Sequence, residues 1–102
     1  MSIKKQFLKS KPVCKVSFKV MKGQVPQADR IFIVGDFNNW NETADELKPL
    51  KDGSFSHTIE LETGREYQFR YLANGNVWFN DEEADSFVSG GVGNEQNGVL
   101  SL

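Results

Sequence analysis

The chain has one cysteine, no long apolar run and little net charge, and each shortage excludes a class of protein. Because Cys14 is alone, no internal disulfide can form, which agrees with a reducing compartment. No stretch approaches the roughly 20 apolar residues of a membrane-spanning helix. The N-terminal lysines are not followed by the roughly 7 to 15 apolar residues of a signal peptide. We therefore expect a cytoplasmic protein with no membrane partner.

Charge is nearly balanced but unevenly distributed along the chain. A dedicated nucleic-acid-binding domain is strongly basic, so a formal net charge of −2 predicts no nucleic-acid partner. Residues 1–22 nevertheless contain seven lysines and no acid, and residues 81–85 contain four acids. Such runs most often only keep a surface solvated, although a basic arm could also contact a phosphorylated or acidic partner.

Groups suited to catalysis or metal binding are equally scarce. The single histidine, His57, lies within a predicted strand, where a packed or edge imidazole is expected. Cys14 falls on the apolar side of its strand, where thiols are usually inert. The acidic stretch from Asp81 does not follow the calcium-hand pattern, because its sixth and twelfth positions are Ser86 and Val92 instead of glycine and glutamate. We therefore expect no enzyme, no metal site and no cofactor.

What the chain does contain is a series of short strands separated by turns. Apolar and polar residues alternate with period two along several segments, and Asp-Gly and Asn-Gly pairs mark tight turns between them. No segment shows helical periodicity of useful length. The pattern predicts an all-β antiparallel sandwich over residues 13–102, preceded by a basic arm at residues 1–12 that joins the sheet late. The predicted strands are about seven: 13–20, 30–34, 47–50, 55–61, 66–73, 77–79 and 99–102.

One of these strands feeds a loop whose composition suits a sugar. Residues 31–34 are apolar, and the polarity changes at Gly35-Asp36, after which two amides, Asn38 and Asn39, precede Trp40. An indole can cover the apolar face of a pyranose while amides exchange hydrogen bonds with its hydroxyls. The two amides are equally able to satisfy the backbone of the loop instead.

A second segment supplies a cation. Along residues 66–73, the alternation that buries Tyr67, Phe69 and Tyr71 directs Arg70 to the opposite, wet face. A planar guanidinium in that position can donate two hydrogen bonds to adjacent sugar hydroxyls.

Together these motifs resemble carbohydrate-binding module family 48. The resemblance rests on residues 34–40 (Val-Gly-Asp-Phe-Asn-Asn-Trp), the strand and turn at 67–75, then Trp78 and Asp81, and finally Asn97-Gly98-Val99-Leu100. That family includes the glycogen-binding domain of the AMP-activated protein kinase β subunit and the early-set domain that precedes the catalytic barrel of branching and debranching enzymes. The resemblance covers residues 13–102.

The resemblance implies an immunoglobulin-like sandwich that binds α-1,4-glucan, such as glycogen or starch, without catalysis. It implies two aromatic platforms, Trp40 and Trp78, and hydrogen bonding from Arg70 and Asn97. Val92 falls near a leucine that pierces the ring of a cyclic glucan in the kinase domains, and Asn39 completes the expected site.

Two alternatives remain open from the sequence. Each tryptophan could be a structural residue, with Trp40 plugging the sandwich edge and Trp78 packing in the core. The domain could also keep the fold while docking, through its lysine arm or a sheet face, on a glycogen-metabolising enzyme or a kinase. Whether both indoles lie on one exposed surface separates the first alternative from a sugar platform.

Overall fold

The computed structural model describes the chain except for residues 1–2, 22, 24–27 and 90–95. The described residues form nine strands and one short 3-10 turn, η1 (Asp36–Asn38). The strands are β1 (Ile3–Phe7), β2 (Val13–Val20), β3 (Ile31–Gly35), β4 (Lys48–Pro49), β5 (Phe55–Glu62), β6 (Glu66–Ala73), β7 (Val77–Phe79), β8 (Ser86–Ser89) and β9 (Gln96–Ser101).

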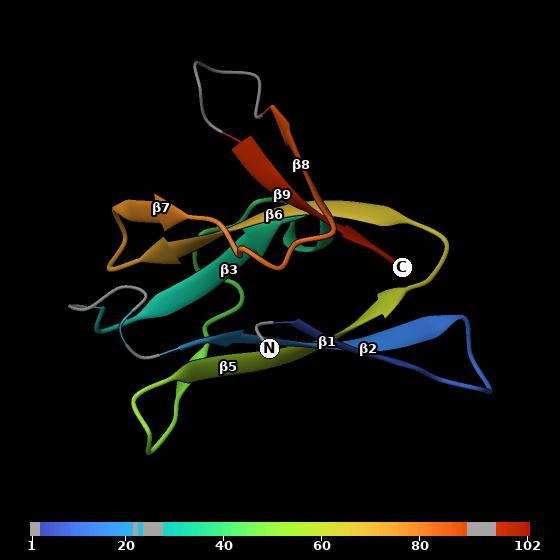
Figure 1. Ribbon diagram of the computed structural model, residues 1–102, viewed down its shortest axis with the longest axis horizontal. Coiled ribbons are helices and arrows are strands. Elements are labelled where there is room, and N and C mark those ends of the chain that lie inside the picture. The colour runs from blue at the N-terminus through green and yellow to red at the C-terminus, as the bar shows by residue number, and fades with distance from the viewer. Residues whose placement is uncertain (1–2, 22, 24–27, 90–95) are drawn as a thin grey trace.

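The strands make two antiparallel sheets that face each other, which confirms the predicted sandwich (Figure 1). Sheet A has four strands in the order β1-β2-β5-β4. Sheet B has five, in the order β3-β6-β9-β8, with β7 paired to the same edge of β6 as β9. Among the described residues, no helix is long or apolar enough to cross a membrane.

The expected number of strands, about seven, was too low by two. The segment predicted as a basic arm contains β1, which pairs with β2 from Ile3 opposite Phe18 to Phe7 opposite Cys14. The second additional strand, β8, pairs with β9 and exposes all four of its residues. Neither strand alternates cleanly between apolar and polar residues, so period two does not reveal it.

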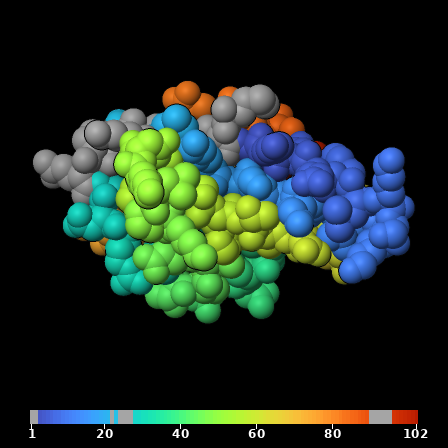
Figure 2. All heavy atoms as spheres, turned by 90° about the horizontal axis from the view of Figure 1, so that it is seen from below, coloured from blue at the N-terminus to red at the C-terminus, as the bar shows by residue number. Residues whose placement is uncertain are grey.

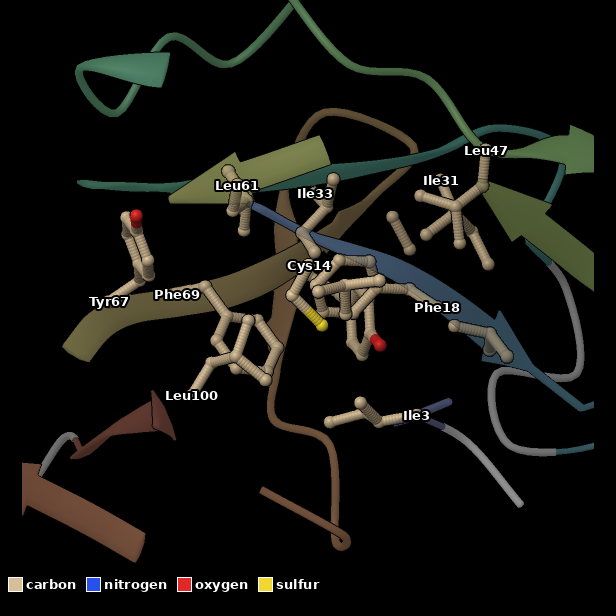
Figure 3. Packing of buried hydrophobic residues seen from close by; sticks show 14 residues of the cluster. Ile3, Cys14, Phe18, Ile31, Ile33, Leu47, Leu61, Tyr67, Phe69 and Leu100 are labelled. Atoms are coloured by element: carbon tan, nitrogen blue, oxygen red, sulfur yellow. The ribbon is translucent and has the colours of Figure 1, made fainter. Parts of the chain in front are cut away.

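The main core lies between the sheets and is rich in aromatic rings (Figure 3). Phe69 of β6 contacts Phe18 of β2, with ring centroids 5.4 Å apart, and Tyr71 at 5.9 Å. The Tyr71 hydroxyl donates to buried Asp81 at 2.7 Å. Burial raises the pKa of Tyr71 well above its ordinary value, and the charge of Asp81 and their hydrogen bond add to this rise. Asp81 thus anchors the acidic loop from inside the sandwich.

The loop after Trp40 returns along the free edge of β3. The backbone N–H of Ile33 donates to the carbonyl of Asp45 at 2.9 Å, and that of Leu47 to Ile31 at 2.8 Å. Leu47 is fully buried in the main core. Residues 41–46 thus wrap this sheet edge and satisfy backbone groups that an open edge would expose.

Candidate glucan-binding face

Gly35 starts the site because it lets β3 approach β6 closely. A side-chain Cβ at position 35 would lie 2.5 Å from the carbonyl oxygen of Gln68 and 2.8 Å from the Cβ of Phe69. Only glycine fits this contact without a shift of the neighbouring strand. The polar loop therefore leaves the sheet directly beside β6.

Phe37 and Asn38 fix the loop that follows. The Phe37 ring packs against the main core, with centroids 6.3 Å from both Phe18 and Tyr67. The Asn38 side chain accepts from the N–H of Gly35 at 3.1 Å and donates to the carbonyl of Ile33 at 3.0 Å. It also donates to Asp45 at 2.8 Å. Asn38 is therefore used within the loop, which is the structural alternative considered for this amide.

The histidine takes part in the same support. His57 Nε2 lies 3.1 Å from the second carboxylate oxygen of Asp45, and its side chain is half-buried. A bond to a carboxylate that itself holds Asn38 makes His57 a structural group behind the loop. No catalytic partner is needed to account for its position.

Asn39 and Trp40 adopt unusual backbone conformations. Their φ values are 57° and 56°, in the left-handed region that non-glycine residues seldom occupy. The exposed Asn39 closes the short turn, and the N–H of Trp40 donates to the carbonyl of Gly35 at 2.9 Å. Two successive residues in this region reverse the chain within one turn, and such strain often accompanies binding sites.

Asp36 orients the Trp40 indole. The indole Nε1–H donates to one carboxylate oxygen of Asp36 at 2.9 Å, and the other oxygen accepts from the backbone N–H of Gln68 at 2.8 Å. The carboxylate thus connects the tryptophan ring to the neighbouring strand β6. The sequence did not reveal this role of Asp36, because a contact with Gln68 across 32 positions leaves no local signal.

Trp78 lies on the same outward face of sheet B. It is directly opposite Leu72 in the register of β6 and β7, whereas its neighbour Phe79 contacts the core ring of Tyr71 at 5.1 Å. The turn at residues 74–76 positions it, since Asn74 and Gly75 have φ values of 53° and 76°. The three-residue turn therefore sends Trp78 outward and Phe79 inward.

The two indoles pack against one small apolar cluster on this face, separate from the main core. The cluster consists of Phe32, Val34 and Leu72, and we call it, with Trp40 and Trp78, the tryptophan face. Val34 and Leu72 are buried although they point away from the core, because the half-buried indoles cover them. Each indole therefore has both a structural contact and an exposed part.

Polar groups lie beside the rings. The Arg70 guanidinium is 5.6 Å from the centre of the Trp78 ring, and its Nε donates to Asn80 at 3.3 Å. Asn97 of β9 donates to the Gln68 side chain at 3.1 Å. Asn97 thus reaches the site from β9, the neighbour of β6, and Asn80 reaches it from the position directly after β7. Gln68 was not predicted as a site residue. The available signal was its alternation with the inward Phe69, which predicts that Gln68 faces outward.

Five of the six predicted site residues can be placed. Trp40, Trp78, Arg70 and Asn97 lie on the outward side of sheet B, and Asn39 is exposed in the loop next to Trp40. Val92 lies outside the described residues. Within the described part of the chain, no group of three or more histidine, cysteine, aspartate or glutamate side chains is arranged to hold a metal ion.

This geometry can bind a ring that has an apolar face and a hydroxylated rim. Aromatic surfaces provide contact area, Arg70 provides planar donors, and Gln68 and Asn97 carry both donors and acceptors. Asp36, Asn38 and Phe37 hold the loop before any ligand arrives. Such preorganisation reduces the entropy lost on binding.

Two curated relatives match part of the chain, and both are enzymes of glucan metabolism. The 1,4-alpha-glucan-branching enzyme of Saccharomyces cerevisiae is 49% identical over 39 residues, which is 37% of this chain and 6% of the enzyme. The enzyme of the same name from Candida glabrata is 47% identical over 47 residues, covering 44% of this chain and 7% of the enzyme. The chain thus spans less than a tenth of either relative.

A family model matches a much larger part of the chain. The family is described as the glycogen recognition site of AMP-activated protein kinase, and the match runs over residues 20–100. It includes the loop with Trp40, all of β6 and β7, and all of β9 except its last residue. The resemblance to carbohydrate-binding module family 48 is thereby confirmed, and the chain belongs to the glycogen-recognition family of AMP-activated protein kinase.

Proposed function

We propose that this chain binds α-1,4-glucan, as a glycogen- or starch-like polymer or a malto-oligosaccharide, through the tryptophan face and without catalysis. One observation carries the proposal: Trp40 and Trp78, on different elements, pack against the same outward cluster. A sugar chain lying across that cluster can contact both indoles while Arg70, beside Trp78, donates to its hydroxyls.

The expected affinity is weak. Two aromatic contacts and a few exposed hydrogen bonds correspond to a Kd of about 10 µM to 1 mM, or about −4 to −7 kcal/mol. Weak single contacts become effective on a polymer with many equivalent chains, because one domain can rebind to a neighbouring chain and several domains can act together.

The test is a titration with maltoheptaose followed by tryptophan fluorescence and by amide chemical shifts. We expect shifts at Trp40, Trp78 and Arg70, and unchanged maltoheptaose after prolonged incubation. Trp78→Ala should remove most of the binding, and Arg70→Gln should weaken it. Because each indole also covers Val34 and Leu72, unfolding of each variant must be measured alongside. A flat response of the folded wild type at millimolar sugar contradicts the proposal.

A second candidate is docking on a protein, such as a glycogen-metabolising enzyme, through the outer face of sheet A. The supporting observation is the position of Lys4, Lys15 and Lys19, which alternate with inward residues of β1 and β2 and so point outward. Glu60 and Glu62 on the neighbouring strand offset part of this charge. This candidate would be favoured if the chain does not bind maltoheptaose but does bind an acidic partner through these lysines.

A further inference from the structure

A recess beside the tryptophan face has no role in the site described so far. Its volume is about 510 Å³, which falls within the range of about 300–1,000 Å³ that is typical of small-molecule sites. It lies where the segment after Trp40 passes along β3 and the turn between β6 and β7 closes. The lining residues used below are Arg30, Phe32, Glu46, Asn74 and Gly75.

The recess continues the tryptophan face. Phe32 belongs both to the outward cluster and to the lining of the recess. Leu72 is directly opposite Phe32 on one side and Trp78 on the other, so these three residues form a row across β3, β6 and β7. Neighbouring strands lie about 4.8 Å apart, so the row extends for about 10 Å. A chain that begins on Trp78 and follows this row reaches the recess.

The walls of the recess carry groups that recognise hydroxyls. Arg30 and Glu46 form a paired contact, with Nε and one terminal nitrogen each 2.9 Å from a carboxylate oxygen. The Arg30 guanidinium is also 5.1 Å from the centre of the Phe32 ring. The hydrogen bond from Arg30 lowers the pKa of Glu46, so this carboxylate is ionised at neutral pH and accepts hydrogen bonds.

The pair is held in place while remaining accessible. The Arg30 and Glu46 side chains are 63% and 41% exposed, so their outer edges meet solvent. Asn74 fixes the backbone at the start of β3, because its side-chain oxygen accepts from the N–H groups of Asp29 and Arg30 at 2.8 and 3.2 Å. A polar wall next to an aromatic floor repeats the chemistry of the tryptophan face.

We propose that this recess is an additional subsite, in which a further glucose unit of a glucan chain bound on the tryptophan face contacts Phe32, Arg30 and Glu46. The proposal rests on the proposed function, since it assigns the recess to the same ligand. It makes the affinity depend on chain length: an oligosaccharide long enough to reach the recess binds more tightly than one that covers only the indoles.

Chain length alone is not a sufficient test, because a longer oligosaccharide also offers more ways to lie on the two indoles. The decisive comparison is therefore between variants. The double variant Arg30→Ala/Glu46→Ala removes the polar wall. The chain offers a matched control in Arg65→Ala/Glu62→Ala, another exposed Arg–Glu pair whose guanidinium lies 5.3 Å from the Tyr67 ring centre.

Both double variants and the wild type are titrated with maltotriose and with maltoheptaose. The recess variant should bind maltoheptaose about threefold to tenfold more weakly, as expected for the loss of one or two hydrogen bonds. Its affinity for maltotriose should equal that of the wild type. The control variant should bind both sugars as the wild type does. In the wild type, maltoheptaose should shift the amides of Asn74 and Gly75, and maltotriose should not.

Three other outcomes would overturn the subsite. If the recess variant binds maltoheptaose as the wild type does, the recess makes no contact with the glucan, and the proposed function stands without it. If the recess variant loses affinity for maltotriose and maltoheptaose equally, Arg30 and Glu46 act on the tryptophan face itself. If the folded wild type binds neither sugar, the proposed function fails together with the subsite.

Discussion

The outer faces of the two sheets are built from opposite kinds of residue. Figure 2 shows the outer face of sheet A, with β1 and β2 in blue and β5 in yellow-green. Lysines of β1 and β2 point outward there, beside a Ser17–Thr58 hydroxyl pair whose oxygens are 3.0 Å apart. The outer face of sheet B instead carries Phe32, Val34 and Leu72 beneath two indoles. One face is an ordinary solvated surface, whereas the other is apolar where solvent should favour polar groups. This apolar cluster on an outer face, covered by two half-buried indoles, is the observation on which the proposed glucan binding rests.

The largest expected effect comes from removing the close approach that supports the tryptophan face. Gly35→Ala would place a Cβ 2.5 Å from the carbonyl oxygen of Gln68, so β3 and β6 must separate. We expect a loss of about 1–3 kcal/mol in the free energy of unfolding, measured with urea, together with weaker glucan binding.

Gly98→Ala is the matched control for this substitution. There the nearest atom to a new Cβ is the Ala84 methyl at 3.1 Å, a milder contact on another strand of sheet B. It should cost less stability than Gly35→Ala. Equal losses at the two positions would show that the approach of β3 to β6 is not specially tight.

A smaller effect is expected from the carboxylate that holds Trp40. Asp36→Ala removes the acceptor for the Trp40 indole and for the backbone N–H of Gln68. We expect about 1 kcal/mol lower stability and roughly threefold to tenfold weaker binding of maltoheptaose, because the indole loses its fixed orientation.

Asp52 provides the equivalent control on the side of sheet A. Its carboxylate also accepts two hydrogen bonds within a turn, from the N–H and the hydroxyl of Ser54 at 3.0 and 2.6 Å. Asp52→Ala should lower stability by a similar amount and leave glucan affinity unchanged. If both variants weaken binding alike, the effect arises from general loosening, and the orienting role of Asp36 is contradicted.

The next prediction concerns the contact that joins the two sheets. Lys5 of β1 donates to Asp85 at 2.8 Å and to the carbonyl of Ser101 at 3.1 Å, while Asp85 accepts from the N–H of Ser101 at 2.7 Å. Partial burial raises the pKa of Asp85, but the hydrogen bonds from Lys5 and Ser101 outweigh it, and the net pKa is below its ordinary value of 3.8.

A folded-state pKa below the unfolded value means that the ionised form stabilises the fold. The stabilisation is complete above the unfolded pKa and is lost as pH falls below about 4 through the folded pKa. The Lys5 and Asp85 side chains are about a quarter to a third exposed, so solvent partly screens their attraction. We therefore expect the pair to contribute less than about 1 kcal/mol to the free energy of unfolding. Urea unfolding of wild type and Asp85→Asn should differ at pH 7 and converge toward pH 2. A constant difference across this range would contradict the assignment.

Two neighbouring strands of sheet A show how far the sequence predicts the fold. Strand β2 follows period two: it buries Cys14, Val16 and Phe18 and directs Lys15 and Ser17 outward, so both the strand and its core face are predictable. By contrast, β1 begins Ile-Lys-Lys-Gln and its inward Lys5 is used in an ion pair. Its charge conceals a strand that only pairing with β2 defines.

The candidate site was predictable only in part, for reasons of distance along the chain. The outward position of Arg70 follows from alternation within β6, but the direction of Trp78 depends on the turn at residues 74–76. The contact of Asp36 with Gln68 and the shared cluster beneath the indoles join segments that are remote in sequence. Periodicity describes one strand at a time and carries no information about such contacts.

The smallest expected effects are on the outer face of sheet A. Thr58→Val removes one hydroxyl of the Ser17–Thr58 pair, and the triple variant Lys4→Gln/Lys15→Gln/Lys19→Gln removes three outward charges. Because these groups remain solvated, stability should change by no more than about 0.5 kcal/mol in urea unfolding. Maltoheptaose affinity should equal that of the wild type. If the lysine variant instead loses glucan affinity, sheet A takes part in sugar binding, and the division of the molecule into a solvated face and a binding face is wrong.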